Sequence, residues 1–201
     1  MGQPAKTLKN PARPDERRVL EDRALQIGMM FRLSRSTRLQ PYLLLIALFV
    51  MFWEQSEWWE PLVLTLIYSL GTWAFDKLRA AHVAADPPPE AADIWGRRFA
   101  WCSLLSGSCW GLAGFLYFTP DSAPHQTFLA LTMLGISTSA VMSRAGYLPA
   151  FYAYTMAVML PLIVRSFISG DPLDVGAGVL GMIYYAGISL WAHTFSREQR
   201  D

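Results

Sequence analysis

Four long stretches that contain no Asp, Glu, Lys or Arg constrain this chain more than any other feature of its sequence. They cover residues 99–120, 122–143, 145–164 and 175–196. A helix of about 20 residues crosses the roughly 30 Å hydrocarbon core of a bilayer. Only 16% of the 201 residues are charged, against about 25% in soluble domains. The sequence therefore predicts an all-α, polytopic membrane protein with a single membrane domain.

Two shorter uncharged runs precede these stretches, at residues 39–53 and 61–75. A run of about 15 residues gives only about 22 Å of helix, so each run must borrow flanking residues to cross. Trp58 and Trp59 lie between the runs, and tryptophan prefers the headgroup level of a bilayer. We expect a helical hairpin with a short acidic turn, which makes six transmembrane helices in all. A re-entrant pair that never crosses is the alternative.

The distribution of cationic residues predicts the orientation of these six helices. With the N-terminus inside, every one of the 17 Lys and Arg residues except Arg165 falls in a cytoplasmic segment, as the positive-inside rule requires. The predicted outer connections are short and acidic. No signal peptide is expected, because the first 38 residues are polar and basic. Both termini are therefore placed in the cytoplasm.

Residues 1–38 are predicted to form a cytoplasmic or interfacial segment with one amphipathic helix. Its apolar residues recur at helical spacing among arginines, and they are Leu20, Ala24, Ile27, Met30 and Phe31. Such a helix either lies on the anionic inner leaflet or packs against protein on the cytoplasmic side. The longest inner connection, 76–98, contains three consecutive prolines that favour an extended linker.

The sequence contains none of the motifs expected for nucleotide binding, zinc proteolysis or an activated serine. The four long stretches carry no ionised side chain for proton coupling. Cys102 and Cys109 are about 10 Å apart along a helix, which is beyond disulfide reach. His125 and His193 fall on opposite membrane faces. We therefore expect no catalytic residue, no metal, no cofactor and no nucleic-acid partner.

Small and polar residues within the predicted spans favour close helix packing or the lining of a ligand cavity. Gly107 and Gly111 form a GxxxG match in the third span, and Ser137 belongs to a small-residue patch in the fourth. Pro161 should kink the fifth span near its outer end, because proline removes a backbone hydrogen bond. Packing is the simpler interpretation of the serine patch, and a cavity lining is the alternative.

Arg165 is the exceptional cation on the predicted outer side. It can pair with Asp171 or Asp174 across the short loop that follows it. It can also meet an anionic ligand or a lipid headgroup. The ion pair is the simpler of the two interpretations.

From residue 95 onward, the order and spacing of several short motifs become specific. They are WGRR at 95–98, WGLAG at 110–114, PHQTFLA at 124–130, GYLPAF at 146–151, PL at 161–162 and GDP at 170–172. In this order the chain resembles the MASE-like, six-helix N-terminal sensor regions of bacterial diguanylate cyclases, phosphodiesterases and hybrid histidine kinases. The likeness covers about half of the chain. The first two spans match in position and hydrophobicity alone.

The resemblance implies a dimeric sensor in a bacterial inner membrane. Such a sensor relays a ligand or a membrane state through its sixth helix to a cytoplasmic output module, either a c-di-GMP enzyme or a histidine kinase. We expect a cytoplasmic segment at 1–38, a six-helix sensor domain at 39–196 and the start of a signalling helix at 197–201. No output module follows, so no enzymatic activity is expected of these residues. The expected partners are membrane lipids, a small lipid-like or fatty-acid ligand, and a second copy of the chain.

Residues that contact a ligand are expected among the aromatic and polar side chains of spans three to five. The candidates are Trp101, Trp110, Ser137, Tyr147, Tyr152, Tyr154 and Arg165. A small transporter or channel is the alternative function, and it would need a polar path that starts near 137–139 and Thr155. A passage open to both faces would favour transport, whereas a closed bundle with a projecting last helix would favour sensing.

Overall fold

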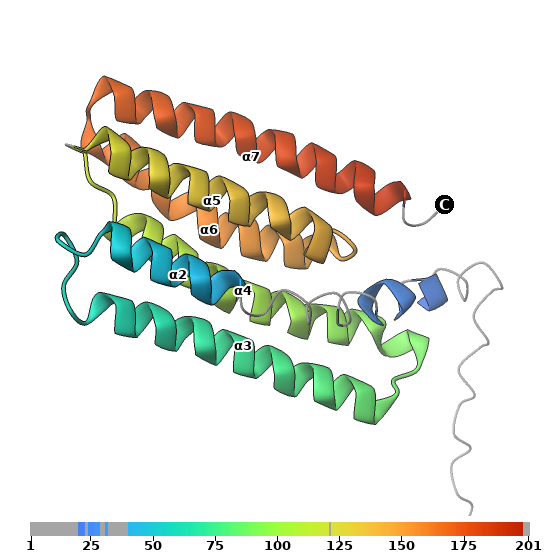
Figure 1. The fold of residues 1–201 in the computed structure, drawn as a ribbon. Coiled ribbons are helices and arrows are strands. Elements are labelled where there is room, and N and C mark those ends of the chain that lie inside the picture. Colours follow the sequence, from blue (N-terminus) through green and yellow to red (C-terminus); the bar gives the residue numbers. More distant parts are fainter. Residues whose placement is uncertain (1–19, 23, 29–30, 32–39, 121, 199–201) are drawn as a thin grey trace, which may run out of the picture.

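The computed structural model describes residues 20–22, 24–28, 31, 40–120 and 122–198. Within these residues the regular secondary structure is entirely helical. Six long helices, α2 to α7, run side by side and alternate in direction, with short connections at both ends of the bundle (Figure 1). The predicted all-α fold is confirmed.

The helices differ in their capacity to cross a membrane. They are α2 (Gln40–Met51), α3 (Glu60–Ala85), the 3-10 helix η1 (Pro89–Ala91), α4 (Ala92–Leu116), α5 (Ala123–Arg144), α6 (Leu148–Ser169) and α7 (Pro172–Glu198). In the described part of the chain, four are long and apolar enough to span: α4 with η1, α5, α6 and α7. The described part of α2 covers only about 18 Å, and α3 carries Asp76, Lys77 and Arg79 in its second half. The structure thus supports a membrane-embedded bundle with four helices of spanning length, where the sequence predicted six.

Prolines and a glycine set several of the helix boundaries. Pro61, Pro124, Pro149 and Pro172 each lie in the first turn of a helix. A backbone N–H has no intrahelical partner there, so proline loses nothing by lacking one. At the other end of α6, Gly170 adopts a left-handed backbone with φ of 74°, which a residue without a Cβ accepts readily. The local sequence therefore accounts for where these helices begin and end.

The backbones of α4 and α6 meet at the centre of the bundle. A Cβ atom at Gly107 would lie 2.6 Å from the carbonyl oxygen of Tyr154, and one at Gly111 would overlap the carbonyl oxygen of Ala157. Only glycine permits so close an approach of two helices. The predicted glycine face of the third span is thus a helix contact, and its partner is α6.

Two hydrophobic clusters form the interior. The larger one includes Trp110 and Met133 and extends through α2 to α7. The smaller one lies where the N-terminal segment meets the bundle and joins Ile27 and Phe31 to Trp95 and other residues of α4 and α6. For these two residues of the N-terminal segment, the structure shows packing against protein. Of the other residues in the predicted amphipathic pattern, Met30 and the arginines lie outside the described residues.

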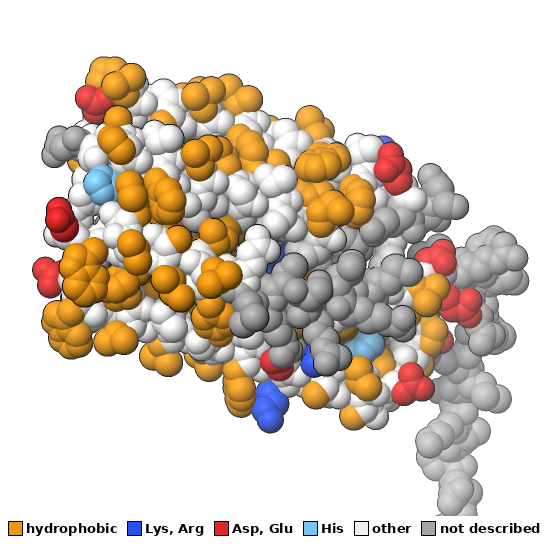
Figure 2. All heavy atoms as spheres, viewed as in Figure 1, with side chains coloured by type: hydrophobic (Ala, Val, Ile, Leu, Met, Phe, Trp, Pro, Cys, Tyr) orange, Lys and Arg blue, Asp and Glu red, His pale blue; other side chains and the backbone are white. Residues whose placement is uncertain are grey.

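The surface is apolar along the sides of the bundle. Figure 2 shows hydrophobic side chains over the length of the helices, whereas the acidic side chains in this view gather mainly at the two ends. Exposed apolar residues include Leu66, Ile168 and Leu180. This distribution is the one expected where lipid surrounds the middle of a bundle and water meets its ends.

Candidate functional site

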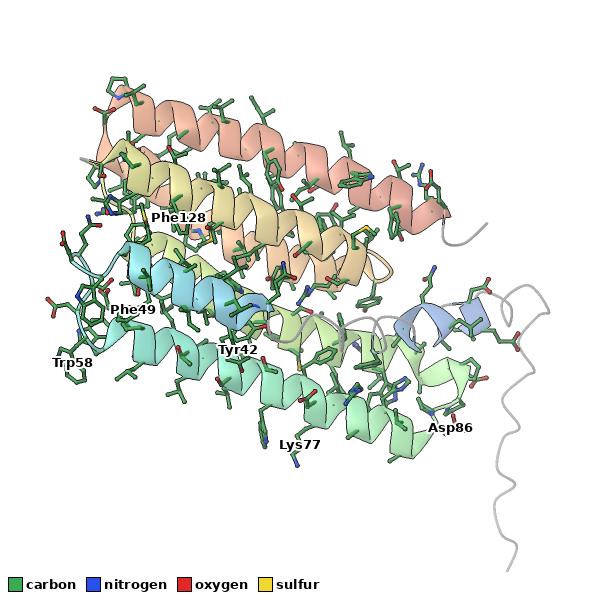
Figure 3. All side chains as sticks on the ribbon, viewed as in Figure 1. Tyr42, Phe49, Trp58, Lys77, Asp86 and Phe128 are labelled. Atoms are coloured by element: carbon green, nitrogen blue, oxygen red, sulfur yellow. The ribbon has the colours of Figure 1, made fainter. Side chains whose placement is uncertain are left out.

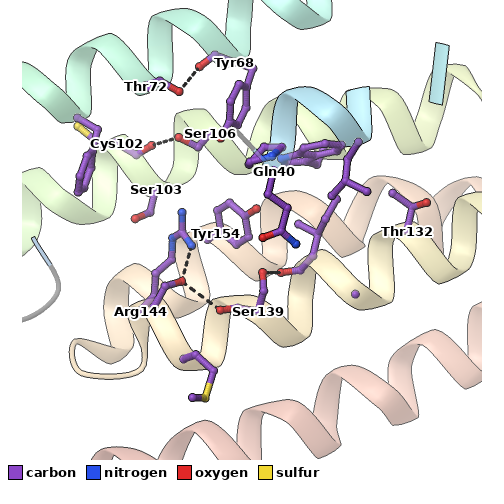
Figure 4. Close-up of a pocket in the computed structure, with 18 of the residues that line it drawn as sticks. Gln40, Tyr68, Thr72, Cys102, Ser103, Ser106, Thr132, Ser139, Arg144 and Tyr154 are labelled. Atoms are coloured by element: carbon purple, nitrogen blue, oxygen red, sulfur yellow. Dashed lines mark hydrogen bonds between the residues drawn. The ribbon is translucent and has the colours of Figure 1, made fainter. Parts of the chain in front are cut away.

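A cavity of about 670 Å³ lies among α2, α3, α4 and α5, and it also reaches Tyr154 of α6 (Figure 4). Small-molecule sites in proteins commonly have volumes of roughly 300–1,000 Å³. The cavity is elongated along the bundle, because its α5 side runs from Phe128 to Arg144, about 24 Å along the helix axis. Its size and shape suit a small elongated molecule.

Much of the wall of this cavity is apolar. Leu44 lines it from α2, Trp110 from α4, and Phe128, Leu131 and Met142 from α5. The ring of Trp110 packs edge-on against Tyr68 of α3, with ring centroids 6.0 Å apart. These side chains offer contacts to hydrocarbon along most of the length of the cavity.

The end of the cavity beside the C-terminus of α5 is polar, and Arg144 is its main feature. The guanidinium carbon of Arg144 lies 3.9 Å from the centroid of the Tyr154 ring. Its Nη1 donates a hydrogen bond to Ser143 Oγ at 2.8 Å, and Ser143 Oγ donates in turn to the carbonyl oxygen of Ser139 at 3.1 Å. The Nε atom is buried and has no hydrogen-bond partner among the described residues. Figure 4 shows this side chain directed into the bundle beside Tyr154.

The hydroxyls on the α3 and α4 walls bond back to their own helices. Thr72 donates to the carbonyl oxygen of Tyr68 at 3.0 Å, and Ser106 donates to that of Cys102 at 3.0 Å. Cys109 joins the two helices, since its Sγ lies 3.2 Å from the carbonyl oxygen of Leu64. These hydroxyls keep an acceptor lone pair while satisfying their donor. The Cys109 contact thus links α3 to α4, and none of these bonds involves Arg144.

Two of the seven predicted ligand-contact residues line this cavity. Trp110 and Tyr154, which are 44 positions apart in the sequence, both border it. Trp110 is almost fully buried, and Tyr154 is buried beneath the guanidinium of Arg144. Both were singled out as aromatic residues of spans three and five.

The remaining predicted residues lie elsewhere. Trp101 is 71% exposed on the outer surface of α4. Ser137 is fully buried in α5, and within the described residues its hydroxyl has no hydrogen-bond partner. The ring of Tyr147 packs on Gly96, and Tyr152 contacts Phe151 and His193. None of these four borders the cavity.

Arg165 lies near the C-terminal end of α6, away from the cavity. Its guanidinium lies over the rings of Phe115 and Phe118, at 5.6 and 5.7 Å from their centroids. The two carboxylates predicted as its partners are engaged otherwise. Asp174 accepts a hydrogen bond from Gln126 at 2.9 Å, and Asp171 accepts one from the backbone N–H of Leu173 at 2.8 Å. Arg165 is therefore held by aromatic rings, a cation–π contact that requires no carboxylate.

His125 links the connection between α4 and α5 to the end of α2. Its Nε2 donates to the carbonyl oxygen of Met51 at 3.2 Å, and its Nδ1 accepts from Ser122 Oγ at 2.6 Å. Its ring also packs on Phe52, with centroids 5.1 Å apart. Across the described parts of the chain, no three His, Cys, Asp or Glu side chains are grouped as metal ligands would be. His125 thus has a structural role at the end of the bundle.

A second, smaller hollow of about 450 Å³ lies at the outer end and is lined by Met51, Glu54 and His125, among others. It shares no lining residue with the large cavity. Along α2, the fully buried Leu48 separates Leu44, which lines the large cavity, from Met51. The two hollows are therefore not joined along α2.

Gln40 and Arg144 were not predicted as contact residues, whereas Ser139 belongs to the serine patch for which a cavity lining was the alternative interpretation. All three residues, Gln40, Ser139 and Arg144, line the cavity. In the sequence analysis, Arg144 served only to predict the orientation of the membrane spans. One signal was available, because Arg144 is the single cation of a short inner connection and directly follows an uncharged stretch.

Known proteins provide no independent assignment of this site. No family model, no curated protein and no solved structure matches the chain. An assignment of function rests on the geometry of the bundle and on its sequence.

Proposed function

We propose that this chain is the membrane-embedded signal-input domain of a dimeric receptor, with six spans and both termini on the cytoplasmic face of a bacterial inner membrane. In this proposal α2 and α3 cross as a hairpin and complete a bundle with the four helices of spanning length. Two observations support it. α2 and α3 run alongside the other helices (Figure 1), and Tyr42 of α2 packs edge-on against Tyr68 of α3 with centroids 5.0 Å apart.

The observation that carries the proposal is the form of α7. This helix is 27 residues long, and only 17% of its most apolar window is buried within the bundle, against 44% for that of α4. It packs on α6 and α5, and its cytoplasmic part extends beyond the turn that joins them (Figure 1). A helix with few buried contacts can shift as a unit with little repacking. Such a helix suits the transfer of a change from the bundle to a module that follows it.

One side chain connects α7 to the helix that borders the cavity. The hydroxyl of Tyr184 on α7 donates to the carbonyl oxygen of Leu134 on α5 at 2.7 Å and also bonds the Thr138 hydroxyl. Leu131 and Gly135, on neighbouring turns of α5, line the cavity. A shift of α5 caused by an occupant would therefore act on Tyr184. An occupant moves this equilibrium only by the difference between its affinities for the two arrangements.

In this proposal the residues of the bundle perform no catalysis. Any activity belongs to the output module, a c-di-GMP enzyme or a histidine kinase. A second copy of the chain would pack against the exposed apolar side of α7, where Leu180, Ile183 and Leu190 lie. The transporter alternative has less support, since the two hollows share no lining residue.

A fusion experiment tests the relay. A diguanylate cyclase module is joined after Asp201, and one to seven residues are inserted after Glu198. We expect c-di-GMP synthesis to vary with insert length at the period of a helix, because the relay depends on the rotational phase of α7. Tyr184→Phe, which removes both hydrogen bonds to α5, should change the output about fivefold or more. Tyr152→Phe, a half-buried tyrosine of α6, is the matched control. Output that ignores both the insert length and Tyr184→Phe would contradict the proposal.

A further inference from the structure

We propose that the cavity binds an amphiphile with one anionic group and one hydrocarbon chain, with the anion on Arg144 and the chain along the apolar wall. This inference rests on the sensor function proposed above and names the class of its ligand. The charge of Arg144, its hydrogen-bond donors and the shape of the wall support it in turn.

Arg144 places a positive charge within the bundle. It is the last residue of α5, but its side chain turns back over Tyr154 and borders the cavity. A guanidinium removed from water needs compensation. The Tyr154 ring supplies a cation–π contact, and the C-terminal end of α5 supplies the negative end of the helix dipole. Both compensate the charge of the guanidinium, but they do not provide hydrogen-bond acceptors for most of its N–H groups.

Within the described residues, Arg144 has one hydrogen-bonded donor and one buried donor without a partner. A guanidinium has five N–H donors in a fixed planar arrangement. A planar fork of this kind matches the two oxygens of a carboxylate or phosphate. An anionic group at this end of the cavity would satisfy both the charge and the donors.

Two further polar side chains surround the same end. Gln40 of α2 and Ser139 of α5 line the cavity near Arg144 (Figure 4). The Ser139 hydroxyl donates to the carbonyl oxygen of Ile136 at 2.7 Å, so the N–H groups that can reach an anion at this end are those of Arg144 and of the Gln40 amide. Asp76 also lines the cavity, from α3. An anion is therefore expected on the α5 side, with Arg144.

The apolar wall continues from this end towards the outer part of the bundle. Met142, Leu131 and Phe128 succeed one another on α5, with Leu44 and Trp110 on the helices that face them. A polar group fixed at one end and a long, largely apolar wall beyond it are the features of a site for a chain-like amphiphile. The chemistry is shared by a free fatty acid and by an anionic phospholipid, and the experiment separates the two sources.

Binding is measured with the full chain in nanodiscs of phosphatidylcholine, with radiolabelled hexadecanoate as the probe. We expect saturable binding by the wild type, and competition by unlabelled hexadecanoate but not by hexadecanol, which lacks the charge. Arg144→Gln should weaken binding about tenfold or more, because a charge-assisted hydrogen bond is lost. Arg144→Lys should be intermediate, since it keeps the charge without the fork. Arg165→Gln, the control, should bind as the wild type does.

A second variant obstructs the hydrocarbon chain of the ligand and leaves the charge of Arg144 in place. Gly135 lines the cavity, and a Cβ built there meets no atom within 4 Å. Gly135→Leu is therefore expected to fold and to weaken hexadecanoate binding about tenfold or more, because its side chain would occupy part of the wall that the hydrocarbon chain contacts. Nanodiscs that contain phosphatidylglycerol separate the sources: loss of hexadecanoate binding identifies the phospholipid as an occupant, and unchanged binding identifies the free acid.

The inference is overturned if hexadecanol competes as well as hexadecanoate, or if Arg144→Gln and Gly135→Leu both bind like the wild type. Its failure is distinct from failure of the proposed relay. If the output of the fused cyclase follows the phase of α7 but the chain binds no hexadecanoate, the sensor function stands and this class of ligand is wrong. If the chain binds hexadecanoate but the cyclase output does not depend on the phase of α7, the ligand site stands and the relay is wrong.

Discussion

At Gly111 the backbone of α4 lies so close to the backbone of α6 that a methyl group would overlap the carbonyl oxygen of Ala157. This contact brings Trp110 on α4 and Tyr154 on α6 to the border of the same cavity. Lipid offers apolar side chains no less favourable surroundings than protein does, so close backbone packing contributes much of what holds membrane helices together. The two glycines of α4 thus position the walls of the candidate site.

Gly111→Ala should therefore destabilise the bundle. We expect its free energy of unfolding to fall by about 1–3 kcal/mol, the usual cost of overpacking a tight interface. Gly135→Ala is the matched control, because a Cβ there meets no atom within 4 Å. Alanine is the better helix former by about 1 kcal/mol, so the control should lose no stability. Equilibrium unfolding in detergent measures both, and equal effects of the two variants would contradict the packing described here.

At the scale of elements, the C-terminal end of α3 and the N-terminal end of α4 form a cluster with the N-terminal segment. The ring of His82 on α3 lies 4.7 Å from that of Phe31 and 5.0 Å from that of Trp95 on α4, measured between centroids. His82 lies beyond the apolar run 61–75, outside the proposed span. Burial lowers the pKa of His82 below its usual range, while Asp86 acts in the opposite direction. The histidine is thus kept neutral where the N-terminal segment packs.

The stability of the bundle should consequently depend on pH. As the pH falls below the unfolded pKa of about 6.5, the unfolded chain binds a proton at His82 that the folded chain does not. Stability is therefore complete above this pH and is lost as the pH falls through the lowered folded pKa. Thermal unfolding between about pH 5 and 8 should show this loss in the wild type and a smaller loss in His82→Phe. His193→Phe, at an exposed histidine, should retain the wild-type profile, and a profile unchanged by His82→Phe would contradict the role given to this cluster.

At the scale of the whole molecule, the bundle divides into an apolar middle and polar ends. Side chains on all six helices point outward as well as toward the core (Figure 3), and those exposed along the middle are largely Leu, Ile, Val and aromatic residues. The charged residues of α3 begin at Asp76, after the apolar run. In the proposed arrangement, this places the second half of α3 in the cytoplasm and its first half in lipid.

Labelling on either side of α3 tests that arrangement. Glu57 precedes α3, Glu90 follows it, and both are exposed. In a background of Cys102→Ala and Cys109→Ala, we expect Glu57→Cys to react with an impermeant maleimide in intact cells. Glu90→Cys should react only after the inner membrane is opened. Because α3 alone separates the two positions, labelling of both from the same side would show that α3 does not cross.

Much of the fold follows from properties that a sequence carries locally. The uncharged stretches correspond to α4 to α7, because hydropathy and length belong to single segments. Gly107 and Gly111 predicted a close helix contact, because small residues permit one whatever the partner is. Length and hydropathy do not identify α2 and α3 as spans in the same way. The described part of α2 is shorter than a span, and α3 becomes charged midway.

The candidate site depends on the tertiary structure. The sequence alone determined an α-helical chain with four segments of the length and hydropathy of membrane spans. Of its candidate contact residues, Trp110 and Tyr154 border the cavity. Trp101 faces outward instead, because the rotation of a helix about its axis is set by its neighbours. Arg144 marked only the end of a helix in the sequence. Its approach to Tyr154 was decided by tertiary packing, since the direction of a long side chain depends on which helix lies beside it.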